Sequence, residues 1–178
     1  MKLLGISGSL RASSYNTMLL AEAARVFEAE EYTLADLRLP LFDEDLKERE
    51  GTPETVAKLH AQIIAADAVI IATPEYNKNL SGVLKNALDW VSMERPGAWA
   101  KKPVAIMSAS SGITGGVRAQ YSLRHCMTTF NPRILQAPEV MIGNAAEAFD
   151  PNGRLGNERT VKLLGRQMAA LRAEVLRG

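Results

Sequence analysis

The chain has 178 residues, 47% of them hydrophobic and 23% charged, which fits one globular domain spanning residues 1–178. The net charge of +1 gives no electrostatic reason to expect a nucleic-acid or membrane partner. The single cysteine excludes an intrachain disulfide and any multi-cysteine metal or iron–sulfur site. The first predicted element is a buried strand at Lys2–Ser7. Its apolar stretch is too short for a signal peptide or a membrane span, so we expect a cytoplasmic protein.

A loop of small residues at 8–13 follows the first strand, and Ser14 is predicted to cap the helix after it. Residues 31–37 form a weaker second strand. The acidic segment 40–51 is predicted to be a surface loop. Residues 52–54 have the pattern of a helix start, with threonine as the cap, proline in the first turn and an acid near the positive end of the helix dipole.

The clearest strand is Ala68–Thr73, which is apolar without alternation, as a strand covered on both faces should be. A loop at 74–80 leads to Ser81, the predicted cap of the next helix. A fourth strand is expected at 102–108, followed by a second loop of small residues at 109–116.

The last part of the chain is predicted to contain a helix at 117–128, a fifth strand at 133–137, a turn-rich loop at 149–157 and a final amphipathic helix. Strands that alternate with helices indicate an α/β sandwich of three layers, in which helices cover both faces of a parallel sheet. The common order for five such strands is 2-1-3-4-5. In this order the loops after strands 1, 3 and 4 lie side by side, at the edge where ligands bind.

The first of these loops has the chemistry of a phosphate site. The start of a helix offers unpaired N–H groups and a partial positive charge. Ser9, Ser14 and Asn16 add neutral donors, and Arg11 adds a fixed charge. The segment lacks both the Gly-Lys-Ser/Thr ending of a Walker A loop and the spacing of the dinucleotide fingerprint. The alternative is an ordinary serine-rich cap with a surface arginine.

The second loop combines a stiff backbone with an aromatic side chain. Pro74 restricts the exit from the third strand, and Tyr76 offers an amphipathic surface for a planar ligand. Glu75 and Asn77 are candidates either to fix the loop or to contact the ligand. The alternative is a simple turn in which Asn77 and Asn79 tolerate left-handed backbone.

The third loop has small side chains that allow a ligand to approach the backbone closely. Donors near Gly112 are placed to meet the electron-rich edge of a ring. The alternative is a flexible glycine loop.

Three ordered motifs give the chain a resemblance to a known family. They are Gly8-Ser9-Leu10-Arg11 with Ser14 and Asn16, then Pro74-Glu75-Tyr76-Asn77, then Leu84-Lys85-Asn86-Ala87-Leu88-Asp89-Trp90. With these motifs the chain resembles the NAD(P)H-dependent FMN reductase family, which includes quinone, chromate and azo-dye reductases with a flavodoxin-like fold. The resemblance extends over nearly the whole chain.

The resemblance implies FMN as cofactor and NAD(P)H as cosubstrate. The FMN phosphate would be held by Ser9, Arg11, Ser14 and Asn16, with Tyr15 also at the cofactor. Pro74, Glu75, Tyr76 and Asn77 would border the isoalloxazine ring, and Ser110 and Gly112 would approach its other edge. Members of the family commonly form dimers or tetramers, and the run Arg118, Gln120, Tyr121, Arg124 resembles a segment that makes subunit contacts in tetrameric members. No catalytic side chain is expected, because FMN carries the chemistry.

The predicted activity is a two-step, ping-pong exchange. Hydride passes from a reduced nicotinamide to FMN, and a quinone or another small oxidant (a flavin, an azo dye or chromate) is then reduced. Two alternatives remain at this point: an electron-transfer flavoprotein without nicotinamide activity, and a phosphate-binding hydrolase or sensor on the same fold. The sequence leaves the physiological acceptor, the preferred nicotinamide and the choice between dimer and tetramer open.

Other polar residues are interpreted as structural. Lys85 and Asp89 have the i,i+4 spacing of an exposed helix pair. Trp90 is expected in the core or at an interface. No catalytic role is expected for His60, His125 or Cys126, since no partner acid or base accompanies them.

Overall fold

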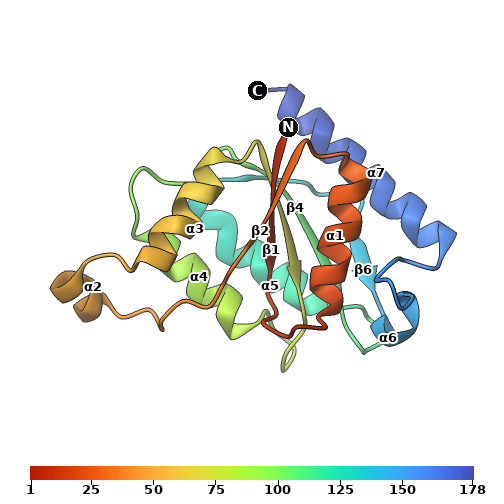
Figure 1. Cartoon of the computed structure of the whole chain (residues 1–178), viewed down its shortest axis with the longest axis horizontal. Coiled ribbons are helices and arrows are strands. Elements are labelled where there is room, and N and C mark those ends of the chain that lie inside the picture. Colours follow the sequence, from red (N-terminus) through yellow and green to blue (C-terminus); the bar gives the residue numbers. More distant parts are fainter.

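The computed structural model describes residues 1–178 and is built around one parallel sheet (Figure 1). The strand order β2-β1-β3-β4-β5 confirms the predicted order 2-1-3-4-5, and a sixth strand, β6, also pairs with β4. The strands are β1 (Lys2–Ser7), β2 (Glu31–Ala35), β3 (Ala68–Thr73), β4 (Pro103–Ala109), β5 (Arg133–Ile134) and β6 (Val140–Ile142).

Helices cover both faces of the sheet, as predicted. Helices α1 and α7 lie on one face, and α3, α4 and α5 lie on the other (Figure 1). None of the helices combines the length and the apolar character that crossing a bilayer requires. The helices are α1 (Tyr15–Phe27), α2 (Glu44–Glu50), α3 (Glu54–Ala65), α4 (Gly82–Ser92), α5 (Val117–Met127), α6 (Ala145–Ala148) and α7 (Glu158–Leu176), with a 3-10 turn, η1, at Thr128–Phe130.

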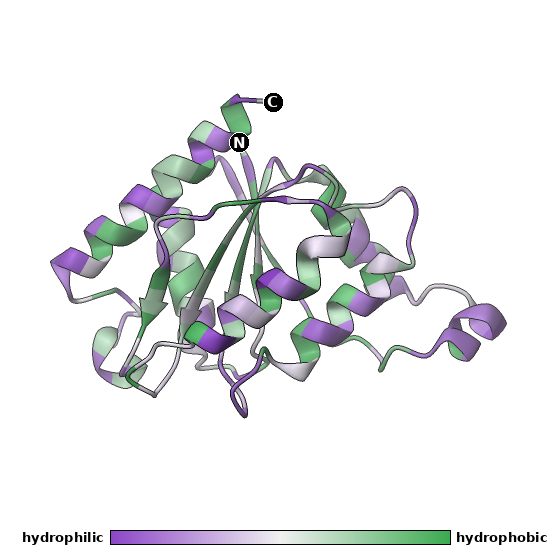
Figure 2. Cartoon of the chain, turned by 180° about the vertical axis from the view of Figure 1, so that it is seen from behind, coloured by the Kyte–Doolittle hydropathy of each residue, from purple (hydrophilic) through white to green (hydrophobic).

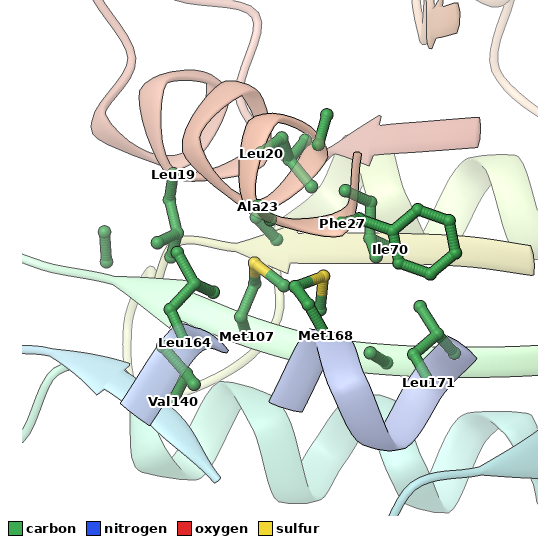
Figure 3. Packing of buried hydrophobic residues seen from close by; sticks show 14 of the residues in the cluster. Leu19, Leu20, Ala23, Phe27, Ile70, Met107, Val140, Leu164, Met168 and Leu171 are labelled. Atoms are coloured by element: carbon green, nitrogen blue, oxygen red, sulfur yellow. The ribbon is translucent and has the colours of Figure 1, made fainter. Parts of the chain in front are cut away.

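The two hydrophobic cores explain why the central strands are apolar without alternation. In β3, Ile70 faces the core beneath α1 and α7, whereas Val69 and Ile71 face the core beneath α3, α4 and α5. Figure 3 shows Ile70 and Met107 between the side chains of α1 and α7. Because both sides of these strands are buried, a polar residue on either side would lose its contact with water.

The predicted fifth strand, 133–137, is wrong in its extent. Only Arg133–Ile134 pairs with β4 there, and pairing resumes at Val140–Ile142. Pro138 has no N–H to donate and lies within the interruption. The Gln167 side chain of α7 donates to the free carbonyl of Ile106 at 3.1 Å and to that of Pro138 at 2.9 Å. A buried glutamine therefore replaces part of the strand ladder.

The segment 40–51 is not wholly a loop, because α2 forms within it. The Asp43 carboxylate accepts from the N–H of Asp45 at 3.0 Å and caps this short helix. The predicted threonine cap of the next helix is also wrong. Thr52 donates its hydroxyl to Glu94 at 2.8 Å, and the cap position before α3 is held by Pro53, which makes no side-chain cap bond.

Candidate functional site

The loops after β1, β3 and β4 meet at the carboxyl edge of the sheet, at the bottom of Figure 1. They enclose an open cleft of about 190 Å³. All three predicted loops contribute, so the sequence-based grouping of these segments is confirmed. The cleft is lined by Ser9, Arg11, Ser14, Tyr15, Asn16, Pro74, Glu75, Tyr76, Ala109, Ser110 and Ser111.

Gly8 allows the first two loops to come close together. Its N–H donates to the carbonyl of Ala72 at 2.8 Å, which continues the pairing of β1 with β3. A Cβ atom at this position would lie 3.0 Å from both the Pro74 ring and the Ser81 hydroxyl. A larger residue would therefore push the first loop away from the second.

Asn16 joins the first loop to the third. This side chain is buried, and its amide nitrogen donates to the carbonyl of Ala109 at 2.9 Å. Its amide oxygen accepts from the N–H of Ala109, also at 2.9 Å. Because Ala109 ends β4, the two bonds fix the start of α1 against the edge of the sheet.

Glu75 joins the second loop to α5. Its carboxylate accepts from the backbone N–H of Arg118 at 3.0 Å and lies 3.3 Å from the Arg118 guanidinium. The cap residue of α5 is Gly116, at φ 90°, which has no side chain to satisfy the first N–H groups. Glu75 supplies that cap from another loop. The predicted alternative that Glu75 fixes its loop is confirmed.

The end of the cleft at α1 fits a phosphate group. Ser14 caps the helix through a bond from the N–H of Thr17 at 3.3 Å, which leaves its hydroxyl proton available. The N–H groups of Tyr15 and Asn16, in the first turn, have no partner within the helix. Arg11 is exposed, and its guanidinium donates only to the neutral hydroxyl of Ser13, at 3.4 Å, so its charge is not neutralised.

Tyr15 forms one wall of the cleft and is supported from behind. Its ring stacks on Phe149, with 5.9 Å between ring centroids and 11° between the planes. The loop that begins at Phe149 is tied to α1, because Arg154 pairs with Glu22 at 2.5 Å. Burial by itself raises the pKa of Glu22, but hydrogen bonds from Arg25 and Arg154 outweigh this effect and hold the pKa below its ordinary value.

The second loop forms a tight hairpin. The backbones of Tyr76 and Asn79 exchange two hydrogen bonds, each of 3.0 Å. The residues in left-handed conformation are Asn77, at φ 50°, and Lys78, at φ 64°. The expectation was therefore right for Asn77 and wrong for Asn79.

Most of the predicted cofactor residues line the cleft. The two that do not are Asn77, at the turn of the hairpin, and Gly112, farther along the third loop. Ala109 and Ser111 also line the cleft, although they were not among the predicted cofactor residues. Both lie in or next to the segment of small residues, which was the available signal.

Lys85, Asp89 and Trp90 make the structural contacts expected of them. Lys85 and Asp89 pair at 2.6 Å, and Trp90 is buried with its indole N–H on the carbonyl of Pro40 at 2.8 Å. Cys126 lines a hollow of about 690 Å³ between α4 and α5, which shares no residue with the cleft.

The run 118–124 does not form one continuous contact surface. Gln120 is fully buried and donates to Ser108 and Val140, each at 2.8 Å, so it cannot be a subunit contact. Tyr121 is 57% exposed and stays available for such a contact.

Comparisons with known proteins agree with the geometry. A family model described as NADPH-dependent FMN reductase matches residues 1–147. An NAD(P)H-dependent FMN reductase of Pseudomonas aeruginosa is 45% identical over 178 residues, which cover 99% of this chain and 96% of the relative. A quinone reductase of Escherichia coli is 38% identical over 169 residues, covering 92% of this chain and 89% of the relative. Among solved structures, the flavoenzyme NAD(P)H:(acceptor) oxidoreductase FerB of Paracoccus denitrificans matches with a TM-score of 0.89 and 31% identity, covering 99% of this chain and 97% of that chain.

Proposed function

The chain belongs to the NADPH-dependent FMN reductase family, and from this premise we propose that the cleft at the carboxyl edge binds FMN and reduces small oxidants such as quinones. It is an oxidoreductase of flavodoxin-like fold that depends on FMN and a reduced nicotinamide. Flavins, azo dyes and chromate are further candidate acceptors. FMN bound in the cleft would supply the redox chemistry, which is hydride transfer from the reduced nicotinamide and two-electron reduction of the acceptor.

We assign the FMN phosphate to the start of α1. Ser9 and Ser14 offer hydroxyl groups, Arg11 offers the charge, and the backbone N–H of Asn16 points from the first turn of the helix. The Asn16 side chain is engaged with Ala109 and is assigned a structural part instead. The donors are neutral or positive, which suits a phosphomonoester.

We assign the isoalloxazine ring to the space between the second and third loops. Pro74 and Tyr76 would border one edge, with Glu75 and Asn77 shaping the hairpin, and Ser110 with Gly112 would approach the other edge. The Tyr15 ring, which stacks on Phe149, forms the wall of this space on the side of α1. The cleft is open to solvent on its remaining side, so the nicotinamide and the acceptor are proposed to use that side in turn, as a ping-pong exchange requires.

The observation that carries this proposal is that the start of α1, with the exposed Arg11, meets the hairpin after β3 and the small-residue loop after β4 in one open cleft. A carrier without nicotinamide activity would need no open face for a second substrate. We also propose that the protein forms a dimer or tetramer, in which the half-exposed Tyr76 would lie near a second subunit.

The test removes the charge at the phosphate end. Arg11→Ala is expected to raise the dissociation constant of FMN roughly tenfold or more, since it deletes charge-assisted bonds worth about 1.5–3 kcal/mol. Fluorescence titration of the apoprotein measures this constant. Arg49→Ala, an exposed arginine on α2, is the control. An unchanged FMN affinity in Arg11→Ala would overturn the phosphate assignment, and a flavin that stays oxidised with excess NADH and NADPH under anaerobic conditions would overturn the activity.

A further inference from the structure

Lys78 occupies a backbone conformation that its residue type disfavours. It is the second residue of the two-residue turn between Tyr76 and Asn79, with φ 64°, after Asn77 with φ 50°. Hairpin turns with two left-handed residues favour Asn-Gly, because glycine reaches this conformation without steric strain. The first position has the favoured asparagine, but the second has a long charged side chain. The turn therefore keeps a lysine where glycine would be more stable.

The hairpin that presents Lys78 is held firmly at its base. Tyr76 and Asn79 exchange two backbone hydrogen bonds of 3.0 Å each. The Asn79 side-chain oxygen accepts from the N–H of Leu80 at 2.8 Å and from the hydroxyl of Ser122 in α5. Figure 2 shows this hairpin as a hydrophilic projection beyond the ends of the strands. The lysine side chain therefore starts from a fixed point beside the cleft.

Lys78 is also a cation without a partner at this edge of the sheet. Arg38 pairs with Asp36 at 3.0 Å, and Arg118 pairs with Glu75 at 3.3 Å. The exposed side chain of Lys78 forms no ion pair and no hydrogen bond. Apart from Arg11, which is assigned to the FMN phosphate, Lys78 is the positively charged side chain beside the cleft that has no partner.

We propose that Lys78 binds the 2′-phosphate of NADPH and thereby makes the protein prefer NADPH over NADH. NADPH differs from NADH only by this phosphate, and a lysine ammonium is a compact donor for such a group. With the nicotinamide ring in the cleft beside Tyr76, the rest of the dinucleotide extends across the rim, where the hairpin projects. The inference rests on the proposed function, since it names the nicotinamide which that site takes.

The chain offers a closely matched control. Lys101 is an exposed lysine with left-handed backbone, at φ 59°, and its side chain also forms no ion pair. It lies just before β4, at the opposite edge of the sheet from the cleft. Lys78→Gly and Lys101→Gly remove the same charge and relieve the same kind of strain. Lys78→Gln removes the charge and keeps the long side chain.

The first measurement is the ratio of kcat/KM for NADPH to kcat/KM for NADH. This ratio is expected to fall roughly fivefold to tenfold in Lys78→Gly and Lys78→Gln, since a charge-assisted bond is lost, and to stay at the wild-type value in Lys101→Gly. The wild-type ratio should also fall as salt is added, because an exposed pair is screened. A ratio that is unchanged in both Lys78 variants, or that falls equally in Lys101→Gly, overturns the proposal.

The second measurement does not depend on hydride transfer. Calorimetry on the FMN-loaded protein compares adenosine 2′,5′-bisphosphate with adenosine 5′-monophosphate, which lacks the 2′-phosphate. The wild type should bind the bisphosphate more tightly, and Lys78→Gly should lose most of that difference. Equal binding of the two nucleotides by the wild type would contradict the role of Lys78. If neither NADPH nor NADH reduces the flavin, the proposed activity fails, while this binding test of Lys78 still gives its answer.

Discussion

The polar residues of the cleft fall into two groups that differ in how they are held. Asn16 and Glu75 are braced, because their side chains are engaged with backbone groups of other loops. Arg11 and Ser111 are open, because they are exposed and have few or no partners within the chain. The polar residues of the cleft therefore differ in what their side chains can do: those of the braced group hold the loops together, and those of the open group have polar atoms without a partner in the chain.

Removing a braced side chain should have the largest effect on stability. Asn16→Ala leaves both the N–H and the carbonyl of Ala109 buried without partners. We expect a loss of about 2–6 kcal/mol in the free energy of unfolding, at about 1–3 kcal/mol for each of the two unsatisfied groups. Urea denaturation of the apoprotein measures it. Ser13→Ala, an exposed residue in the same loop, should change the value by less than about 0.5 kcal/mol.

If Asn16→Ala instead kept full stability and lost only FMN, Asn16 would belong to the open group. The Asn16 side chain would then contact the ligand, and its bonds to Ala109 would not be what holds the loops together.

The next largest effect on stability is expected at the ion pair between Glu22 and Arg154, which ties the loop behind Tyr15 to α1. Glu22→Gln weakens the pairing of α1 with Arg154, and we expect a loss of about 1–2 kcal/mol at neutral pH. The pKa of Glu22 is lowered in the folded protein, so its contribution is complete above its ordinary pKa of 4.5 and is lost as the pH falls through the lower folded value. Denaturation curves of wild type and variant should therefore converge only in acid, once the pH lies below the lowered folded pKa of Glu22.

A gap between the two proteins that stays constant down to the acid range would mean that the ionised carboxylate is not what stabilises this loop. Lys162→Gln, whose partner Glu158 lies 4.0 Å away on the surface of α7, is a suitable control for an exposed pair and should show little change at any pH.

The sequence was sufficient for the order of the strands and for the position of the cleft, because both follow from short-range patterns. Apolar runs mark strands, Ser14 and Ser81 mark helix starts, and loops after neighbouring parallel strands must meet. The broken fifth strand was not predictable in this way. It depends on Gln167, a residue of the last helix that enters the core to satisfy Ile106.

The division between braced and open residues is likewise a property of the tertiary structure. The cap of α5 comes from Glu75, far away in the sequence, and the bonds of Asn16 go to Ala109. Spacing along the chain indicates that these residues are near a site. It does not indicate whether their polar atoms are already engaged, because their partners lie on elements far away in the sequence: Ala109 ends β4, and Arg118 belongs to α5.

A smaller effect is expected at the other braced residue. Glu75→Ala removes the cap of α5, at a cost of about 1 kcal/mol, whereas Glu75→Gln keeps an acceptor for the N–H of Arg118 and should cost less than half of that. Thermal unfolding of the three proteins measures the order. Equal losses in the two variants would indicate that the ion pair with the Arg118 guanidinium, rather than the cap, stabilises the loop.

The smallest effect on stability is expected in the open group. Ser111 is exposed in the third loop and lines the cleft, so Ser111→Ala should leave the free energy of unfolding within about 0.5 kcal/mol of the wild type. Its dissociation constant for FMN should rise by no more than roughly fivefold, the value of one neutral hydrogen bond. Because an open residue acts only through the ligand, FMN should stabilise the variant less than the wild type by the same factor in affinity, and thermal unfolding with and without FMN measures this difference. An equal loss of stability in the apoprotein and the FMN-loaded protein would place Ser111 with the braced residues.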